Sequence, residues 1–362
     1  MSKDFSYMAR ALKLARRGFY TTDPNPRVGC VLVREGEVIG EGWHRLAGGP
    51  HAEIEALKAA GERARGAECY ITLEPCCHYG RTPPCTEALI RAGVRRVVVA
   101  MIDPNPRVAG QGLAQLRSAG IEVTCGVLEE EARALNRGFC RRMQSGRPWV
   151  VAKLAASLDG RTALASGESR WITSEAARRD VQRMRARSSA ILTGIGTVLA
   201  DDPLLTVRMK EVSRQPLRVV VDSKLRLPLG AKMLSAPGQT LVATVSEDPS
   251  RRAALEAAGA EVLLLPRDAV GRVDLEALFE KLGQREINEV LVEAGPVLNG
   301  ALASSGLVDE WWVYLAPCLL GDEARGLFHL PAFKTLADKV ELQFLEVRRV
   351  GLDLKLCLTR RK

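Results

Sequence analysis

The sequence predicts two α/β domains in a single chain. The chain has 362 residues, which is more than one hydrophobic core usually supports. Apolar, strand-like runs alternate with helix-like segments in both halves, which is typical of sheets with helices on their faces. A polar connector containing Gly and Pro interrupts this alternation near Gly146. We therefore expect a first domain over residues 1–146 and a second over residues 147–362.

Composition places the chain among globular proteins that do not span a membrane. Hydrophobic residues make up 46% of the chain and charged residues 26%. No apolar run approaches the ~20 residues needed to cross a bilayer, and the amino-terminal segment has Arg and Lys within its apolar spacing, unlike a secretion signal. The nine cysteines are scattered from Cys30 to Cys357, which favours reduced thiols. We expect a cytoplasmic protein.

The net charge of +9 is compatible with two kinds of ligand. Lysine and arginine are spread over the whole length and form no basic tail, so small phosphorylated ligands explain the balance as well as nucleic acid does.

The first half alternates strands and helices in chain order. After an amino-terminal helix, two apolar runs separated by Arg34–Glu37 indicate a hairpin, and Gly61 and Gly93 end two of the following helices. This order predicts a mainly parallel sheet with helices on its faces. We expect strands at 30–33, 37–42, 68–74, 94–102 and 121–127, helices at 51–61, 86–93 and 112–120, and one closing helix within 128–148.

The second half restarts the alternation after the connector. Its last stretch, residues 340–360, alternates apolar and polar residues across Gly351, which predicts an antiparallel hairpin at a sheet edge. The expected strands are 149–155, 190–194, 217–223, 240–245, 261–266, 289–295 and 311–317, and the expected helices are 174–188, 250–259, 275–283 and 296–306.

A catalytic metal site is predicted by one histidine and two cysteines. His51, Cys76 and Cys85 supply three zinc ligands, and three protein ligands leave the fourth tetrahedral position for water. Zinc would lower the pKa of that water to ~7. Glu53 follows His51 by two residues, about 200° around a helix, so it would shuttle protons beside the metal and not chelate it. The pattern resembles the H-x-E…P-C-x-x-C signature of zinc deaminases, with Cys85 taking the place of the missing second Cys at the start of a helix.

A structural zinc site is the alternative for this stretch. It would use Cys76, Cys77, His78 and Cys85, but adjacent cysteines seldom bind one ion, and His51 would be left without a role.

The second half contains two Gly-rich candidates for phosphate binding. Gly295 follows an apolar strand and Pro296 suits the first position of a helix, so free amides would face a crevice there. Glu293, at the end of the same strand, could accept hydrogen bonds from a sugar hydroxyl. Gly194 and Gly196 follow another strand, but the G-x-G-x-x-G of a Rossmann dehydrogenase is absent at the first strand.

The motifs in their order resemble the bifunctional deaminase and reductase family of riboflavin biosynthesis. The resemblance rests on NPRVGCV, HAEIEAL, ITLEPCCHYGRTPPC and DPNP in the first half, and on KLAASLDGRTA, GESRWIT, VLADDPLLTVR and VEAGP in the second. It implies a fold of class α/β, with an N-terminal cytidine-deaminase-like domain followed by a C-terminal dihydrofolate-reductase-like domain. It also implies that His51, Cys76 and Cys85 bind Zn²⁺, with Glu53 as the catalytic proton shuttle.

The same resemblance implies further contacts. Asn25, His44, His78, Asp103 and Asn105 would lie near the pyrimidine or its ribose phosphate, although Asp103, before a proline, would also suit a simple turn. NADPH would contact Ala155, Trp171, Thr197, Asp201, Ser223, Gly295, Pro296, Val297, Leu298, Asn299 and Gly300. The reductase substrate would contact Lys153, Ser169, Arg185, Leu205, Arg208 and Glu293, and we expect Arg185 and Arg208 to bind its phosphate bidentately.

The implied function is two successive reactions on a small phosphorylated pyrimidine. Zinc-dependent hydrolysis would deaminate diaminohydroxyphosphoribosylaminopyrimidine, and NADPH would then reduce the ribosyl chain of the aminouracil product to ribityl. The chief alternative is a nucleic-acid editing deaminase of the transfer-RNA adenosine type with an accessory domain; another is that one domain is inactive and serves assembly. We expect no nucleic-acid or membrane partner, and a homo-oligomer.

Overall fold

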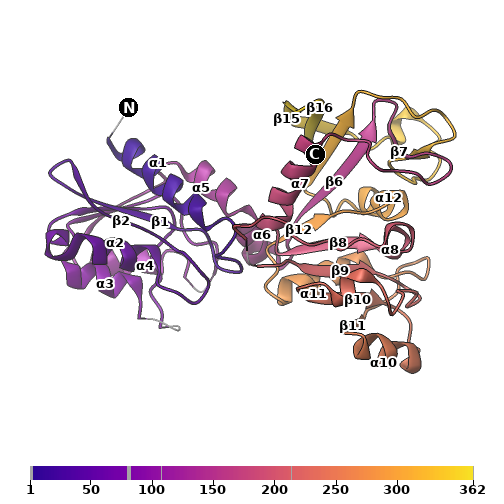
Figure 1. Cartoon of the computed structure of the whole chain (residues 1–362). Helices are drawn as coiled ribbons and strands as arrows, with labels where there is room; N and C mark the ends of the chain where they lie inside the picture. The colour runs from indigo at the N-terminus through magenta and orange to yellow at the C-terminus, as the bar shows by residue number, and fades with distance from the viewer. Residues whose placement is uncertain (1–2, 80–82, 107, 213, 362) are drawn as a thin grey trace. The chain divides into compact units, whose positions relative to one another are not determined.

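The chain divides into two compact units, Met1–Gly146 and Arg147–Lys362. The computed structural model describes residues 3–79, 83–106, 108–212 and 214–361 (Figure 1). Each unit has its own sheet with helices on both faces.

The first unit is built on a five-stranded sheet in the order β2-β1-β3-β4-β5. The predicted hairpin is confirmed, because β1 and β2 pair antiparallel on either side of a tight turn. The expectation of a mainly parallel sheet holds for only half of it: β1 is also antiparallel to β3, whereas β3, β4 and β5 run parallel. The strands are β1 Gly29–Arg34, β2 Glu37–Trp43, β3 Glu68–Ile71, β4 Arg96–Val99 and β5 Glu122–Cys125.

Two hydrophobic layers sandwich this sheet. One buries the apolar faces of α2, α3 and α4 against alternate strand residues such as Leu32 and Ile71. The other buries α1, α5 and α6 against the intervening residues, such as Val31 and Tyr70. Figure 1 shows α1 and α2 on opposite sides of the strands. The helices are α1 Lys3–Ala15, α2 Ala52–Ala60, α3 Cys85–Ala92, α4 Gln111–Ser118, α5 Glu129–Leu135 and α6 Arg137–Ser145, with short 3-10 turns at Arg16–Gly18 and Gly61–Ala64.

The single closing helix expected within 128–148 is wrong, because Asn136 divides it into α5 and α6. The Asn136 side chain is buried, and its amide pairs with the backbone of Arg27: Oδ1 accepts from the amide N–H at 2.8 Å and Nδ2 donates to the carbonyl at 2.9 Å. Asparagine competes for backbone partners in this way, which is why it disfavours helix interiors.

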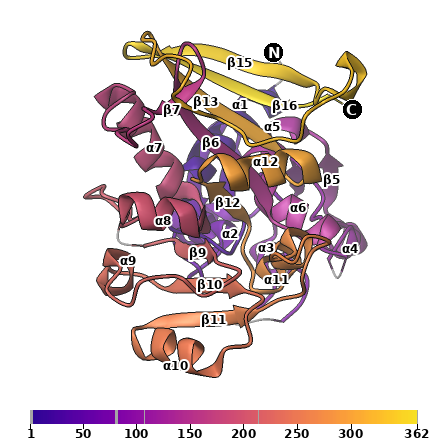
Figure 2. The same cartoon turned by 90° about the vertical axis from the view of Figure 1, so that its right-hand side faces the viewer.

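The second unit has a nine-stranded sheet in the order β11-β10-β9-β8-β12-β6-β13-β16-β15 (Figure 2). The strands from β11 to β13 are parallel. The carboxy-terminal hairpin β15–β16 is antiparallel and lies at the edge, as predicted. The strands are β6 Trp149–Ser157, β8 Ala190–Gly194, β9 Leu217–Val221, β10 Thr240–Thr244, β11 Ala260–Leu264, β12 Glu289–Val292, β13 Glu310–Ala316, β15 Leu342–Val350 and β16 Asp353–Arg360.

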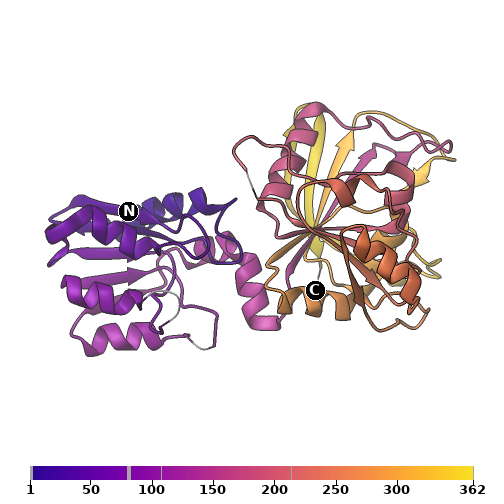
Figure 3. The ribbon, with the colours of Figure 1, turned by 60° about the horizontal axis from the view of Figure 1, so that its bottom comes forward.

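Helices cover both faces of this second sheet (Figure 3). α11 and α12 pack on one face, and α7, α8, α9 and α10 on the other. Four small elements escaped prediction because each is short: α8, α9 and the two-stranded sheet of β7 and β14. Their bounds and those of the other helices are α7 Glu175–Arg187, α8 Ile195–Asp201, α9 Lys232–Ser235, α10 Pro249–Ala257, α11 Leu275–Gln284, α12 Pro296–Ser305, β7 Arg161–Ala163 and β14 Arg325–Gly326, with a 3-10 turn at Leu336–Asp338.

Candidate functional site

Three predicted metal ligands converge in the first unit. His51, Cys76 and Cys85 place one donor atom each within 4.8 Å of one another. His51 is the N-cap of α2, Cys85 is the first residue of α3, and Cys76 lies in the loop after β3. His51 Nδ1 is 3.2 Å from Cys85 Sγ and 3.5 Å from Cys76 Sγ. A nitrogen and two sulfurs in this arrangement fit Zn²⁺, which binds imidazole and thiolate tetrahedrally.

The surroundings favour a thiolate within this cluster. The pKa of Cys76 is lowered to about 4, because its sulfur receives hydrogen bonds from the Cys85 thiol, from His51 and from the Cys85 backbone N–H, the last at 3.3 Å. The pKa of Cys85 is raised, because its thiol donates a hydrogen bond to Cys76 and because it is buried. The pKa of His51 is raised by its hydrogen bond to Cys76. A proton is thus shared among groups that a metal ion would deprotonate on binding.

Glu53 lies beside the cluster and outside it. It stands in the first turn of α2 and is 3% exposed, and its carboxyl group bonds to Cys85. Burial raises its pKa to about 7. A carboxyl group that exchanges its proton near neutral pH suits the acid and base steps of a hydrolysis.

The alternative structural zinc site is not formed. Among the residues that the structure describes, Cys77 and His78 are not part of the metal-ligand cluster. The pKa of Cys77 is raised by burial, so this thiol is kept neutral.

Two of the predicted substrate residues adjoin His51. The Asn25 Nδ2 and His44 Nε2 atoms are 3.0 Å apart, and the rings of His44 and His51 pack edge to face at 5.5 Å. His44 Nδ1 lies 3.0 Å from the Pro50 carbonyl, which fixes Nδ1 as the donor and leaves Nε2 as the acceptor. Burial lowers the pKa of His44, so the ring is held neutral beside the metal ligands.

The other predicted substrate residues lie on the Cys76 side. Asp103 Oδ1 accepts a hydrogen bond from the Asn105 N–H at 2.8 Å. Burial raises the pKa of Asp103 to about 6, and His78 opposes this shift by its charge. The Asp103 carboxyl is also close enough to sense the charge of Cys76. Asn25 and His44 thus adjoin His51, and Asp103, which holds Asn105, lies near Cys76 and His78.

Sequence reasoning missed Glu74, which links the loop that carries Cys76 to the loop that carries Asp103. Its buried carboxylate accepts hydrogen bonds from four backbone N–H groups: Asp103 at 3.1 Å, Gly110 at 2.9 Å, Gly112 at 2.9 Å and Leu113 at 3.3 Å. One acid thereby holds the substrate loop and the start of α4 against the ligand loop. The only signal in the sequence was an acidic residue in an apolar strand end, directly before the Pro-Cys pair.

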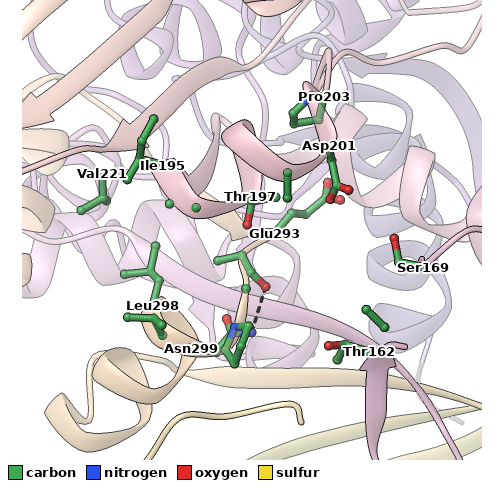
Figure 4. A pocket seen from close by; sticks show the side chains of 18 of the residues that line it. Thr162, Ser169, Ile195, Thr197, Asp201, Pro203, Val221, Glu293, Leu298 and Asn299 are labelled. Atoms are coloured by element: carbon green, nitrogen blue, oxygen red, sulfur yellow. Dashed lines mark hydrogen bonds between the residues drawn. The ribbon is translucent and has the colours of Figure 1, made fainter. Parts of the chain in front are cut away.

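The second unit contains a cavity of about 1470 Å³ at the carboxyl ends of β6, β12, β8 and β9. Ten lysine and arginine residues line it against four acidic ones, so it attracts anions. Figure 4 shows Thr197 and Asp201 on α8 facing Leu298 and Asn299 on α12 across it. The predicted residues on its wall are Lys153, Ala155, Ser169, Trp171, Arg185, Thr197, Asp201, Leu205, Arg208, Ser223, Glu293, Gly295, Pro296, Val297, Leu298 and Asn299.

The start of α12 suits a phosphate group. Gly295 is its N-cap and Pro296 is its first residue, and no side chain at the N-cap accepts a hydrogen bond from the free amides. The free amides at the start of a helix attract an anion, and Gly295 lies on the wall of the cavity. Asn299 donates to the Ala294 carbonyl at 3.0 Å, while its buried Oδ1 has no partner among the described residues. An unpaired buried acceptor beside free amides fits the mixed donors and acceptors of a dinucleotide such as NADPH.

We expected Arg185 to bind a phosphate bidentately, but its guanidinium group is already engaged by other residues. Its Nε and Nη2 atoms donate to both oxygens of Glu293, at 2.6 and 2.9 Å, and its Nη1 atom donates to the Thr206 carbonyl at 3.0 Å. Arg185 in turn keeps the pKa of Glu293 below its usual value, although burial acts to raise it. Burial lowers the pKa of the adjacent Lys153. Arg208, the other arginine predicted to bind the phosphate, also lines the cavity.

Gly300 is also placed differently from the prediction, since it does not line the cavity. A Cβ at this position would lie 1.9 Å from the carbonyl oxygen of His329. Close packing against the His329 backbone therefore requires a glycine at this position.

Two family models match the chain, one in each unit. The Cytidine and deoxycytidylate deaminase zinc-binding region matches residues 1–101, and the RibD C-terminal domain matches residues 148–356. The fold and the two sites thus define a zinc-dependent deaminase joined to a reductase.

Known relatives cover the chain from end to end. The riboflavin biosynthesis protein RibD of Escherichia coli is 54% identical over 98% of this chain and 99% of its own, and that of Aquifex aeolicus is 41% identical over 97% of both. The RibD structure from Acinetobacter baumannii superposes with a TM-score of 0.93 at 47% identity, covering 99% of each chain. A diaminohydroxyphosphoribosylaminopyrimidine deaminase/5-amino-6-(5-phosphoribosylamino)uracil reductase from Thermotoga maritima gives 0.88 at 34% identity, also covering 99% of each. This chain belongs to the RibD family.

Family membership confirms the predicted class of function. The protein is a bifunctional enzyme of riboflavin biosynthesis, with a zinc-binding deaminase domain and an NADPH-dependent reductase domain that act on small phosphorylated pyrimidines. The editing deaminase is not favoured. No helix among the described residues is long and apolar enough to cross a membrane.

Proposed function

We propose that the two reactions are divided between the units, with deamination in residues 1–146 and reduction in residues 147–362. The observation that carries the proposal is the convergence of His51, Cys76 and Cys85 beside the buried Glu53. When bound, Zn²⁺ supplies a Lewis acid that activates water at neutral pH.

The protein side of the deamination follows from the placement of these groups. Glu53 takes a proton from the attacking water and returns it to the departing amine, because its carboxyl group is buried next to Cys85 and titrates near neutral pH. Asn25 and His44 hold one edge of the pyrimidine, and Asp103 and Asn105 hold another through amide and carboxyl groups. Together these residues would hold the amine-bearing carbon close to Glu53 and to His51, Cys76 and Cys85, the residues that would hold the zinc ion.

In the reduction, the residues of the cavity position the two reactants. Arg208 binds the ribose phosphate, and Lys153 with the Arg185–Glu293 pair faces the sugar. The amides at the start of α12 and the side chains of α8 hold the cofactor, which carries the hydride itself.

Substitution Glu53→Gln tests this division of labour. The variant keeps the shape of the side chain but cannot take up the proton. We expect it to lose ammonia release from the diaminopyrimidine substrate while it still oxidises NADPH when deaminated intermediate is supplied. Loss of both activities, or of neither, contradicts the assignment.

We also propose that the chain forms a homo-oligomer, in the cytoplasm, through the edge of the second sheet. β15 has only β16 as a neighbour in the sheet, and apolar side chains on this hairpin are exposed: Leu342, Phe344, Leu345, Val347, Leu352 and Leu354. An unpaired edge with apolar side chains is a template for association with another strand. Sedimentation of the parent and of Phe344→Lys tests this: a monomeric parent, or an unchanged oligomer in the variant, contradicts it.

A further inference from the structure

The strand order of the second sheet fixes a direction along the cavity. The parallel neighbours β6, β12, β8 and β9 end on the same side of the sheet. Lys153 lies on β6, at one side of this row of strands. Glu293 and the glycine that opens α12 follow β12, and the glycine that opens α8 ends β8, so both helix starts lie in the middle, between β6 and β9. Ser223 follows β9, about 14 Å from β6 at the usual spacing of strands.

A dinucleotide whose pyrophosphate sits at the middle must extend in both directions. Its reacting half points to Lys153 and Glu293, where the sugar is reduced. Its adenosine half is therefore directed to the end of β9. The groups available there decide how the protein tells NADPH from NADH, which differ only in the phosphate on the adenosine 2′ oxygen.

The segment after β9 presents two cations to this end of the cavity. Lys224 and Arg226 both line it and both are exposed, whereas the alternating residues Leu225 and Leu227 are buried in the core. Within the described parts of the chain, neither cation has a salt bridge within 4.0 Å. Burial raises the pKa of Asp222, and the charge of Arg226 acts against this shift.

This segment is held firmly from both sides of its backbone. The buried Asp222 carboxylate accepts a hydrogen bond from the Leu227 N–H at 2.8 Å. Arg251 donates to the carbonyls of Leu225, at 2.8 Å, and of Leu227. A fixed backbone lowers the entropic cost of presenting two charges to one anion.

A neighbouring segment adds to the positive charge. The Val273 N–H donates to Ser223 Oγ at 3.1 Å, which brings Arg272 to the same wall of the cavity. The acid in this segment, Asp268, is occupied by the N–H groups of Val270 and Arg272 on Oδ1. The wall therefore combines several cations with a hydroxyl group that can still donate.

We propose that Lys224 and Arg226 bind the 2′-phosphate of the NADPH adenosine and thereby select NADPH over NADH. The proposal rests on the reductase function proposed above and names the residues that give its cofactor preference. Charge-assisted contacts to phosphate from a rigid segment are the interactions that distinguish a phosphorylated ribose from a plain one.

The test is equilibrium binding of cofactors to the full-length protein, followed by NADPH and NADH fluorescence without substrate. Lys224→Ala and Arg226→Ala should each raise the Kd for NADPH roughly tenfold, the effect expected from one lost hydrogen bond to a charged group. The Kd for NADH should change by less than about twofold, since no contact to it is lost. In both variants, the Kd for adenosine 2′,5′-bisphosphate should rise as that for NADPH does, whereas the Kd for 5′-AMP should stay unchanged like that for NADH.

Lys232→Ala is the matched control. Lys232 lines the same cavity, but its Nζ atom pairs with Asp202 Oδ2 at 3.4 Å, so its loss should leave both Kd values within about twofold. The proposed 2′-phosphate site is contradicted if the parent prefers NADPH and the two variants either keep that preference or bind both cofactors equally more weakly. Either result leaves the proposed reductase function intact. A parent that binds neither cofactor overturns both.

Discussion

Replacing Glu74 with alanine should destabilise the first unit strongly. The substitution removes the acceptor for four backbone N–H groups, those of Asp103, Gly110, Gly112 and Leu113. At about 1 to 1.5 kcal/mol for each bond, the free energy of unfolding of this unit should fall by about 4 to 6 kcal/mol. That is a large part of the stability of an ordinary domain. Glu74→Gln retains one oxygen acceptor and should lose roughly half as much.

Hydrogen exchange of the native protein is the suitable assay, because it reports each unit of a two-domain chain separately. In Glu74→Ala, the amides of residues 108–118 should lose protection from exchange. The variant should also lose zinc, because Cys76 lies in the adjoining loop. Glu37→Ala is the control, since this glutamate is 68% exposed and makes one surface ion pair with Arg63; its effect should be within about 0.5 kcal/mol. Equal protection in Glu74→Ala and Glu37→Ala would refute the idea that Glu74 joins the ligand and substrate loops.

Three further predictions concern single positions. Cys85→Ser should lower zinc content and ammonia release together, measured by elemental analysis and an ammonia assay, while reduction of supplied intermediate continues; retained zinc would speak against Cys85 as a ligand. Burial raises the pKa of Asp103 to about 6, so the ionised carboxylate destabilises the folded state: it lowers the free energy of unfolding by nothing well below pH 4 and by its full amount above pH 6. As the pH rises between these limits, the free energy of unfolding of Asp103→Asn should gain up to about 3 kcal/mol over that of the parent, measured by urea unfolding of metal-free protein. Parallel pH profiles of the two proteins would exclude this destabilisation. Gly300→Ala should reduce the melting temperature of the second unit, because its Cβ would lie 1.9 Å from the His329 carbonyl oxygen; an unchanged melt would show that the backbone there can shift freely.

The metal cluster could be predicted from the sequence because its parts are tied to local structure. His51 and Cys85 each stand at the start of a helix, and Cys76 follows a strand, so short-range patterns place all three at one end of the sheet. The ligand loop returns to Cys85 at the start of α3, as the spacing of the cysteines suggested. The carboxy-terminal hairpin was equally visible, because its alternation and Gly351 are local signals.

What could not be predicted depends on contacts between distant residues. The ion pair of Arg185 and Glu293 joins residues 108 positions apart, and only the strand order brings them together. Glu74 likewise finds its partners 29 to 39 residues away. Gly300 looked like part of a nucleotide turn because the carbonyl that excludes a side chain there belongs to a later segment. The spacing of apolar residues predicts which face of a helix or strand is buried. It does not predict which distant residues that face contacts.

The most direct test of the account is X-ray absorption at the zinc edge of active, full-length protein, together with its zinc content. We expect stoichiometric zinc bound by a single imidazole, two sulfurs and a light-atom ligand from solvent. Fully active protein without a bound transition metal, or zinc closed off by a fourth protein side chain, would contradict the account.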